Sequence, residues 1–198
     1  MKIIKNNILV IILILMVLIS IAVYDILPTR LPIHFTLTGT VDGTAPKLEG
    51  ISFMPVMELI LWLISSLGIK DINLKKVIDG IGIILFLAQL TIIGVALKPT
   101  ANNINMINSI ALSCMIIIIA LITRNNKINR YIGIRTTRTM SSDKIWKKTN
   151  TFASNLLLVV GSIGFVLGIF LSSVSFIIII ALLLIAVVGS IVYSYYVK

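Results

Sequence analysis

The chain has 198 residues, of which 58% are hydrophobic and 12% are charged, and its formal net charge is +10. Soluble domains are typically about 45–50% apolar and about 25% charged, so a soluble fold of this size would expose large apolar patches that promote aggregation. The composition argues against a soluble enzyme, a disordered regulator and a disulfide-stapled toxin, and the lone Cys114 is expected to be a small buried hydrophobic residue.

Six apolar segments approach the roughly 20 residues that a helix needs to cross a bilayer. They cover residues 8–27, 51–69, 77–97, 105–123, 152–171 and 174–195. These segments lack the period-two alternation of barrel strands, and backbone groups in lipid must be hydrogen-bonded within the segment. We therefore predict an all-α integral membrane protein with six transmembrane helices.

The first apolar segment allows two interpretations. Residues 1–7 are basic, and Ser20-Ile21-Ala22 has the small-x-small pattern of a signal-peptide cleavage site. Because no polar region precedes this pattern, we expect a retained membrane anchor. Cleavage would instead leave five helices.

Basic residues are distributed unevenly over the loops. If the N-terminus is cytoplasmic, Arg30, Lys47 and Lys98 lie outside and the other 14 of the 17 Lys and Arg residues lie inside. The positive-inside rule therefore predicts that both the N- and the C-terminus are cytoplasmic. Orientation in the membrane and attraction to anionic lipid together account for the net positive charge, and no nucleic-acid partner is expected.

The outer loop between the first two helices is predicted to be small and ordered. Pro28 and Pro32 end the first helix, and residues 33–37 alternate apolar and polar side chains as a short strand does. Turn signals occur at Thr38-Gly39 and Asp42-Gly43. This pattern predicts a small hairpin at the outer mouth of the bundle.

His34 is the one histidine of the chain. It can take up a proton, pair with Asp42 or Glu49, or bind a ligand. The alternative is an interfacial histidine that only bonds to a backbone carbonyl. Since no second His or Cys lies nearby, no metal site and no cofactor are expected.

Glu58 is an acid inside the second apolar segment, about 10 Å below the outer surface at a rise of about 1.5 Å per residue. Such a carboxylate is costly unless it is paired, protonated or hydrated, so it is a candidate functional residue. Its candidate partners are His34, Arg30 and Gln89, and Pro55 would bend the helix beside it. The alternative is a neutral Glu58 that only orients helices.

Other polar and small residues in the apolar segments are expected to be structural. Asp79 is predicted to stabilise the start of the third helix, two residues into it. A cluster at the start of the fourth helix is expected to cap it and to bond between helices: Asn102, Asn103, Asn105 and Asn108. Three glycines share one face of the fifth helix and favour close packing: Gly161, Gly164 and Gly168.

The inner loop, residues 124–150, is basic and amphipathic. Ser141-Ser142-Asp143 is typical of a helix start. An apolar stripe follows at helical spacing, formed by Ile145, Trp146, Thr149, Phe152 and Ala153, with Lys144, Lys147 and Lys148 opposite. This pattern predicts an interfacial helix that leads into the fifth span, with Trp146 in the headgroup belt and a glycine bend before it at Gly133.

Two motifs together resemble one family. In the inner loop Asn129, Gly133-Ile134-Arg135-Thr136, Ser142-Asp143, Trp146 and Thr149 are similar to the signature of the SdpI family, bacterial immunity proteins against a sporulation-delaying killing peptide, although Asp143 stands where the family usually has Glu. In the outer loop Leu31-Pro32-Ile33-His34-Phe35, Gly39, Asp42-Gly43 and Lys47 resemble the small domain of unknown function that precedes the SdpI domain in full-length members. The resemblance covers nearly the whole chain.

The resemblance implies protection of the host membrane from a secreted peptide toxin. In the best-known system the protein is also a toxin receptor that holds a soluble transcriptional repressor at the membrane. Mapped onto this chain, the toxin side comprises His34, Asp42, Glu58 and Gln89. The inner motif and partner side comprises Asn129, Gly133, Arg135, Arg138 and Trp146. The alternative for the two arginines is ordinary positive-inside charge and phosphate contact.

The organisation follows the two motifs. Residues 1–69 form the first two helices and the outer loop, residues 70–123 form the third and fourth helices, and residues 124–198 form the inner loop and the last two helices. Alternatives are an orphan envelope-stress protein of the same fold and a small ion-coupled transporter. The chain is not expected to be an enzyme, because no Ser-His, His-Glu-x-x-His or paired-aspartate arrangement lies within the spans.

Overall fold

The computed structural model describes residues 7–36, 40–67, 69–124 and 126–197. Within these ranges, six helices are long and apolar enough to cross a membrane: α1 (Asn7–Val23), α2 (Lys47–Ser66), α3 (Ile72–Leu97), α4 (Ala101–Thr123), α6 (Asp143–Phe170) and α7 (Ser172–Tyr196). The short helices η1 (Tyr24–Ile26) and α5 (Thr137–Met140) follow α1 and precede α6. The prediction of six membrane-spanning helices is confirmed. The basic run at residues 1–6 and the predicted Thr38-Gly39 turn lie outside the described residues.

Three helices begin four or five residues before the apolar segments that predicted them, because polar residues form part of their first turns. The bounds move from residue 51 to 47, from 77 to 72 and from 105 to 101. Helix α6 begins at Asp143, which confirms the predicted helix that leads into the fifth span. The start of α3 is capped by Asp71, whose Oδ1 accepts hydrogen bonds from the backbone N–H groups of Asn73 at 2.8 Å and Leu74 at 3.3 Å. The prediction that Asp79 lies at this helix start is therefore wrong, since Asp79 comes seven residues after Ile72.

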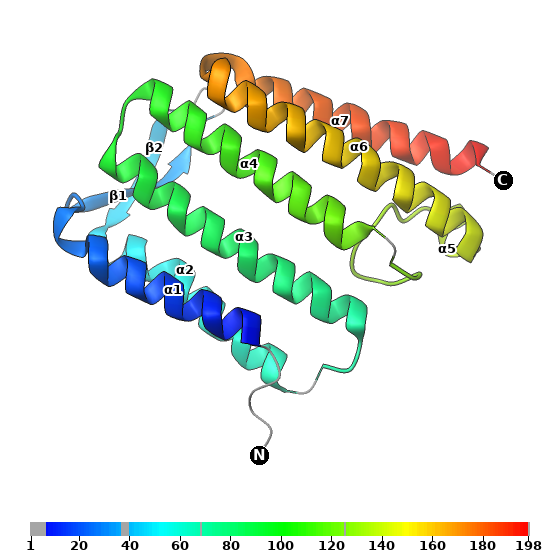
Figure 1. The fold of residues 1–198 in the computed structure, drawn as a ribbon, viewed down its shortest axis with the longest axis horizontal. Coiled ribbons are helices and arrows are strands. Elements are labelled where there is room, and N and C mark those ends of the chain that lie inside the picture. The colour runs from blue at the N-terminus through cyan, green and yellow to red at the C-terminus, as the bar shows by residue number, and fades with distance from the viewer. Residues whose placement is uncertain (1–6, 37–39, 68, 125, 198) are drawn as a thin grey trace.

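The six helices form two packed groups that meet at α3 and α4. Helices α1, α2 and α3 pack together, and so do α4, α6 and α7. The helices run alternately up and down, so that both ends of the described chain lie at one end of the bundle, together with α5 (Figure 1). We call this the termini end and the opposite one, which carries the two strands, the hairpin end.

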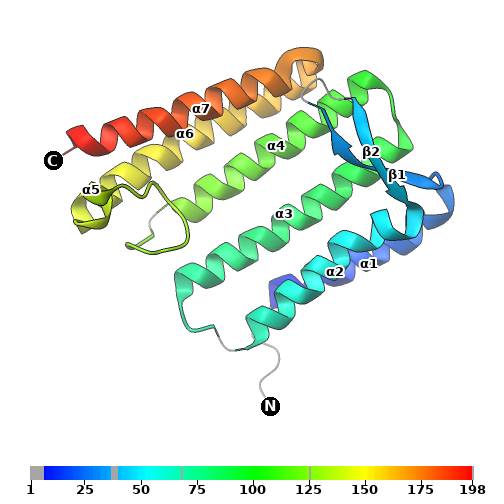
Figure 2. The same ribbon diagram turned by 180° about the vertical axis from the view of Figure 1, so that it is seen from behind.

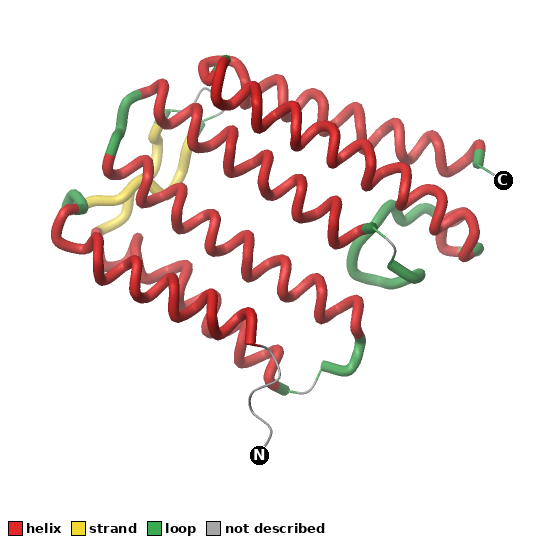
Figure 3. The backbone as a smooth tube through the Cα atoms, in the orientation of Figure 1, coloured by secondary structure: helices red, strands yellow, loops and turns green. Residues whose placement is uncertain are grey.

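The strands β1 (Arg30–Phe35) and β2 (Val41–Pro46) pair antiparallel at the hairpin end (Figure 3). Seen from behind, they cross the ends of α3 and α4 (Figure 2). The predicted small outer hairpin is therefore confirmed, but the prediction of a turn at Asp42-Gly43 is wrong. Both residues lie within β2, where the pairing has a register irregularity beside His34.

The glycine face of α6 makes the predicted close contact with α4. A Cβ on Gly161 would lie 2.6 Å from Cγ1 of Ile117 and 3.0 Å from the carbonyl oxygen of Ser113. A Cβ on Gly164 would lie 2.6 Å from Oγ of Ser113. There is thus no room for side chains at these positions, and the two helix backbones approach each other directly.

Hydroxyl groups add polar links within the same helix group. The Oγ atoms of Ser109 and Ser175 lie 2.7 Å apart between α4 and α7, and Ser154 donates to the carbonyl oxygen of Ala120 at 2.9 Å. Ser172 donates to the side chain of Asn102, which confirms the predicted interhelical bonding for this member of the asparagine cluster.

Substitution of Gly161 with alanine is expected to destabilise the α4–α6 contact by about 2 kcal/mol, because the new methyl group overpacks against a backbone oxygen that cannot rotate away. The measurement is the midpoint of unfolding in a denaturing-detergent titration of the full chain. Gly189→Ala on α7 is the matched control, since a Cβ there meets nothing within 4 Å. Equal midpoints for the two variants would contradict the packing described here.

Candidate functional site

His34 and Asp42 face each other across the hairpin. Nδ1 of His34 lies 2.5 Å from Oδ1 of Asp42, and the two side chains are 72% and 43% exposed. Of the two acids predicted as partners, the ring therefore bonds to Asp42. When Nδ1 donates to this carboxylate, Nε2 of the neutral ring is left as an exposed acceptor for a ligand. Gly43 permits the arrangement, because a Cβ there would lie 2.8 Å from the Cβ of His34.

The hairpin is attached to the bundle through a buried apolar cluster. Leu31 of β1 is fully buried among Leu27, Ile51, Ile92, Ile93 and Ala96. Gly50 at the start of α2 brings the helix against this strand, since a Cβ there would lie 2.9 Å from the Cβ of Leu31. The hairpin is thus packed against α2 and α3 through Leu31, three residues before His34.

Glu58 is fully buried between three helices. Neither carboxylate oxygen has a hydrogen-bond partner among the described residues. A Cβ on Gly82 of α3 would lie 2.8 Å from Oε1 of Glu58 and 2.5 Å from Cδ2 of Leu9 on α1. Asp79, one turn before Gly82, adds electrostatic repulsion to the charged form of Glu58. The glycine therefore forms the floor of a tight apolar cage around the acid.

Gln89 lies two turns after Gly82 along α3, nearer the hairpin end, and links α3 to α1. Its Nε2 donates to Oγ of Ser20 at 2.6 Å and to the carbonyl oxygen of Met16 at 3.1 Å. The side chain is 3% exposed, and its Oε1 has no partner among the described residues. The Gln89 amide group therefore links α3 to α1, and its oxygen is an acceptor in the interior of the bundle with no partner among the described residues.

The predicted surroundings of Glu58 differ from those observed. Glu58 comes eleven residues after the first residue of α2, which places it about 16 Å along the helix axis. Because α2 begins at Lys47 and not at Ile51, Glu58 lies one turn further along its helix than the seven residues expected. His34 bonds to Asp42, Arg30 donates to Thr44 at 2.9 Å, and Gln89 bonds to α1, so these three polar groups are engaged elsewhere.

The inner loop is shaped by two asparagines and one glycine. Oδ1 of Asn129 accepts bonds from the backbone N–H groups of Tyr131 at 2.9 Å and Ile132 at 3.0 Å. Gly133 has a φ of +123°, which confirms the predicted glycine bend. Oδ1 of Asn150 on α6 then accepts a bond from the N–H of Ile134 at 2.7 Å. The loop is thus folded back onto the first turns of α6.

Trp146 is the buried anchor of this loop. Its ring is 1% exposed, and Nε1 donates to the carbonyl oxygen of Asn126 at 2.7 Å. The prediction that Trp146 lies in the headgroup belt is therefore wrong, because the loop folds over the ring and supplies its hydrogen-bond acceptor. Ser142 caps α6 as predicted, accepting from the N–H of Ile145 at 3.4 Å.

The two motif arginines bond to the backbone. Arg135 is exposed and donates to the carbonyl oxygen of Arg130 at 2.8 Å. Arg138 is half-buried and donates to the carbonyl oxygen of Val197 at 3.1 Å, which ties the loop to the end of α7. Of the five inner candidates, Asn129, Gly133 and Trp146 thus shape the loop, while Arg135 remains accessible on its surface.

Two residues that shape these sites did not stand out as candidates in the sequence. Ser20 is suggested there only as part of a cleavage pattern, although it is the hydrogen-bond partner of Gln89. Asn150 lies one turn after Trp146, accepts the bond from Ile134 and donates to the carbonyl oxygen of Trp146 at 3.1 Å. In the sequence, the one feature that indicates a role for Asn150 is its position four residues after Trp146, on the same helix face.

Known proteins match this chain along nearly its whole length. Residues 125–194 match the family described as the SdpI/YfhL protein family, and residues 11–59 match a domain of unknown function (DUF1648). The chain is similar to the immunity protein SdpI of Bacillus subtilis (strain 168), with 32% identity over 198 residues that cover 97% of this chain and 95% of the relative. No solved structure matches the chain significantly.

Proposed function

The chain belongs to the SdpI/YfhL protein family, and from this membership we propose that it is an immunity protein that protects its own cell from a secreted antimicrobial peptide. The predicted family resemblance is thereby confirmed, and the chain is a multi-pass bacterial membrane protein. The observation that carries the proposal is the identity to an immunity protein across 97% of this chain and 95% of the relative. It supports immunity over an envelope-stress protein or an ion-coupled transporter.

The peptide is proposed to meet the hairpin end, which the positive-inside rule predicts to lie outside. His34 and Asp42 offer an exposed acceptor and an exposed carboxylate on the strand pair. Gln89 and Glu58 lie further from the hairpin and offer oxygens that have no hydrogen-bond partner in the described part of the chain. Binding alone is enough for protection, and we propose no catalytic step.

A receptor role that holds a soluble repressor at the membrane is a finer part of the proposal. The exposed Arg135 and the lysines of the termini end offer a basic surface, and α4, α6 and α7 connect this surface to the hairpin end. The same lysines would attract anionic lipid. Peptide binding would transmit a signal only if it changed the relative stability of two arrangements of these helices.

Survival of a toxin-sensitive host that expresses the chain tests the proposal, with the sporulation-delaying killing peptide added to the culture. Wild type is expected to raise the peptide concentration that halves survival. His34→Ala is expected to lower this concentration about tenfold, equivalent to about 1.4 kcal/mol of binding free energy. Lys98→Ala, another exposed side chain of the same end, is the control. Failure of wild type to protect would overturn the proposed function with this peptide, and full protection by His34→Ala would remove His34 from the site.

A further inference from the structure

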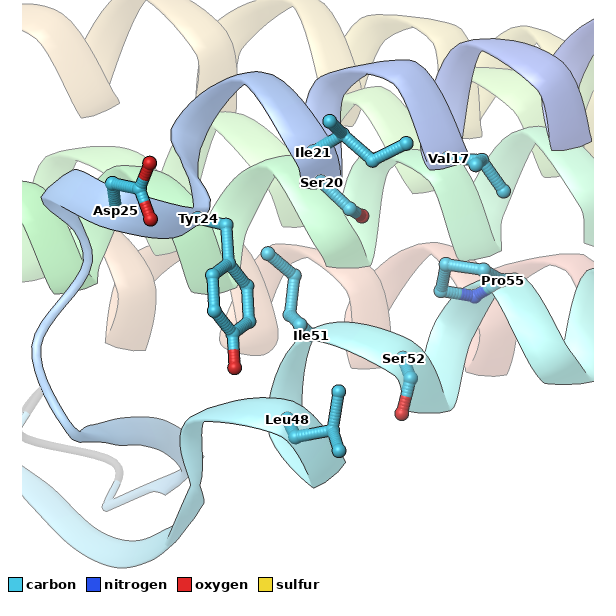
Figure 4. A pocket seen from close by; sticks show the side chains of 9 residues that line it. All are labelled: Val17, Ser20, Ile21, Tyr24, Asp25, Leu48, Ile51, Ser52 and Pro55. Atoms are coloured by element: carbon cyan, nitrogen blue, oxygen red, sulfur yellow. The ribbon is translucent and has the colours of Figure 1, made fainter.

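A groove of about 480 Å³ runs between α1 and α2 at the hairpin end. Its lining residues come from α1, η1 and α2: Val17, Ser20, Ile21, Tyr24, Asp25, Leu48, Ile51, Ser52 and Pro55. Figure 4 shows the Tyr24 ring reaching from η1 towards Leu48 and Ile51 of α2, where it forms one wall. From Leu48 to Pro55 the groove follows about 10 Å of helix, the span of two turns. We call it the α1–α2 groove.

The α1–α2 groove opens sideways, where lipid would surround the protein. Ile21 and Leu48 on its two rims are 68% and 65% exposed, and Val17 is 41% exposed. A peptide that has already entered the outer leaflet can therefore reach the groove without returning to water. The two-turn length matches a bound helix that inserts apolar side chains spaced by three, four and seven residues.

One charged group, Asp25, is among the residues that line the groove. No hydrogen-bond or ion-pair partner engages its carboxylate among the described residues. The nearby cation is engaged elsewhere: Nζ of Lys47 donates to the carbonyl oxygen of Tyr24 at 3.0 Å and lies 4.9 Å from the centre of its ring. The groove mouth therefore presents a carboxylate without a hydrogen-bond or ion-pair partner among the described residues to an incoming ligand.

Two other cavities differ from the groove in the charges that line them. A cavity of about 320 Å³ under the hairpin is lined by Ile33, Phe35 and nine more residues, none of them charged. A cavity of about 440 Å³ at the termini end is lined by Lys127, Lys147, Asp143 and two uncharged residues. The α1–α2 groove also lies entirely within residues 11–59, the segment that matches DUF1648.

We propose that the α1–α2 groove is the docking site for the apolar face of the secreted peptide, and that Asp25 receives a cationic group of that peptide. Peptides that act at membrane interfaces carry Lys and Arg on one face and Leu, Phe or Trp on the other, which complements an apolar groove with one acid at its mouth. Ser20 lines the groove and bonds to Gln89 of α3, so a bound peptide would also contact a residue that is linked to α3. This inference rests on the proposed function.

Two pairs of matched variants test the groove in the survival assay. Ser52→Phe fills the groove from α2, whereas Ser173→Phe makes the same change on the exposed first turn of α7 at the same end. Asp25→Asn removes the charge at the mouth, whereas Glu49→Gln removes an exposed charge of the neighbouring first turn of α2. We expect Ser52→Phe to lower the peptide concentration that halves survival by at least about tenfold and Asp25→Asn by about threefold, with both controls unchanged.

Photocrosslinking in nanodiscs supplies a second readout that does not depend on survival. With a photoreactive benzoylphenylalanine in place of Ile21, the full chain is expected to capture the killing peptide, and Ser52→Phe is expected to abolish this product. Capture of phospholipid alone or of a second copy of the chain would overturn the inference. So would full protection by Ser52→Phe and Asp25→Asn, which would leave the proposed function intact. If wild type neither protects nor captures the peptide, the proposed function fails and the groove assignment fails with it.

Discussion

Substitution of Gly133 with alanine is expected to destabilise the inner loop by about 3 kcal/mol. The φ of +123° lies in a region that L side chains rarely adopt, and such strain costs about 1–3 kcal/mol. The new Cβ would also lie 2.6 Å from Oδ1 of Asn150, the atom that accepts the hydrogen bond from Ile134. Because alanine cannot keep this backbone conformation and this bond together, the loop would leave its place on α6.

Two measurements test this expectation. The unfolding midpoint of Gly133→Ala should fall well below that of wild type, while Gly189→Ala, which introduces the same methyl group into open space, should match wild type. Trypsin should also cleave at Arg130 and Arg135 faster in Gly133→Ala, because these residues lie in the loop that is released. Unchanged cleavage together with an unchanged midpoint would contradict the assigned role of Gly133.

The helices could be predicted from the sequence because lipid imposes one rule on every span. Long apolar segments must satisfy their backbone groups internally, and this rule is independent of which helices later become neighbours. The bounds were less predictable, since Lys47 and Asp71 continue or cap a helix beyond its apolar part. Polar first turns carry no apolar signal, although a cap such as Asp71 is recognisable once the helix start is known.

Side-chain partners could not be predicted because they depend on tertiary packing. A tryptophan in a basic amphipathic loop suits the headgroup region, but the acceptor that buries Trp146 comes from Asn126, twenty residues earlier. The pairing of His34 with Asp42 was one of the alternatives left open, and the strand register selects it. The docking of α1 beside α3, which engages Gln89 with Ser20, leaves no local trace in the sequence.

The burial of Glu58 leads to a prediction with opposite effects on stability and protection. Both oxygens lack partners among the described residues, and Asp79 repels the charged form, so the acid costs the fold free energy. Replacing even a buried ion pair with apolar residues of similar volume is often neutral or stabilising by about 1–4 kcal/mol, and an unpaired acid has no partner that offsets its desolvation. Glu58→Met is therefore expected to raise the unfolding midpoint in a denaturing-detergent titration.

Glu58→Met is at the same time expected to reduce protection from the killing peptide. A carboxylate that weakens helix packing and bonds to no described side chain is free to engage a ligand or a proton during peptide binding, and methionine can do neither. Glu58→Gln, which keeps the shape but not the ionisable group, should stabilise less because its amide is also left unpartnered. If Glu58→Met were more stable than wild type and protected fully, Glu58 would only orient helices. If it were less stable, an unrecognised partner would hold the carboxylate, and the cage formed by Gly82 and Leu9 would not describe its surroundings.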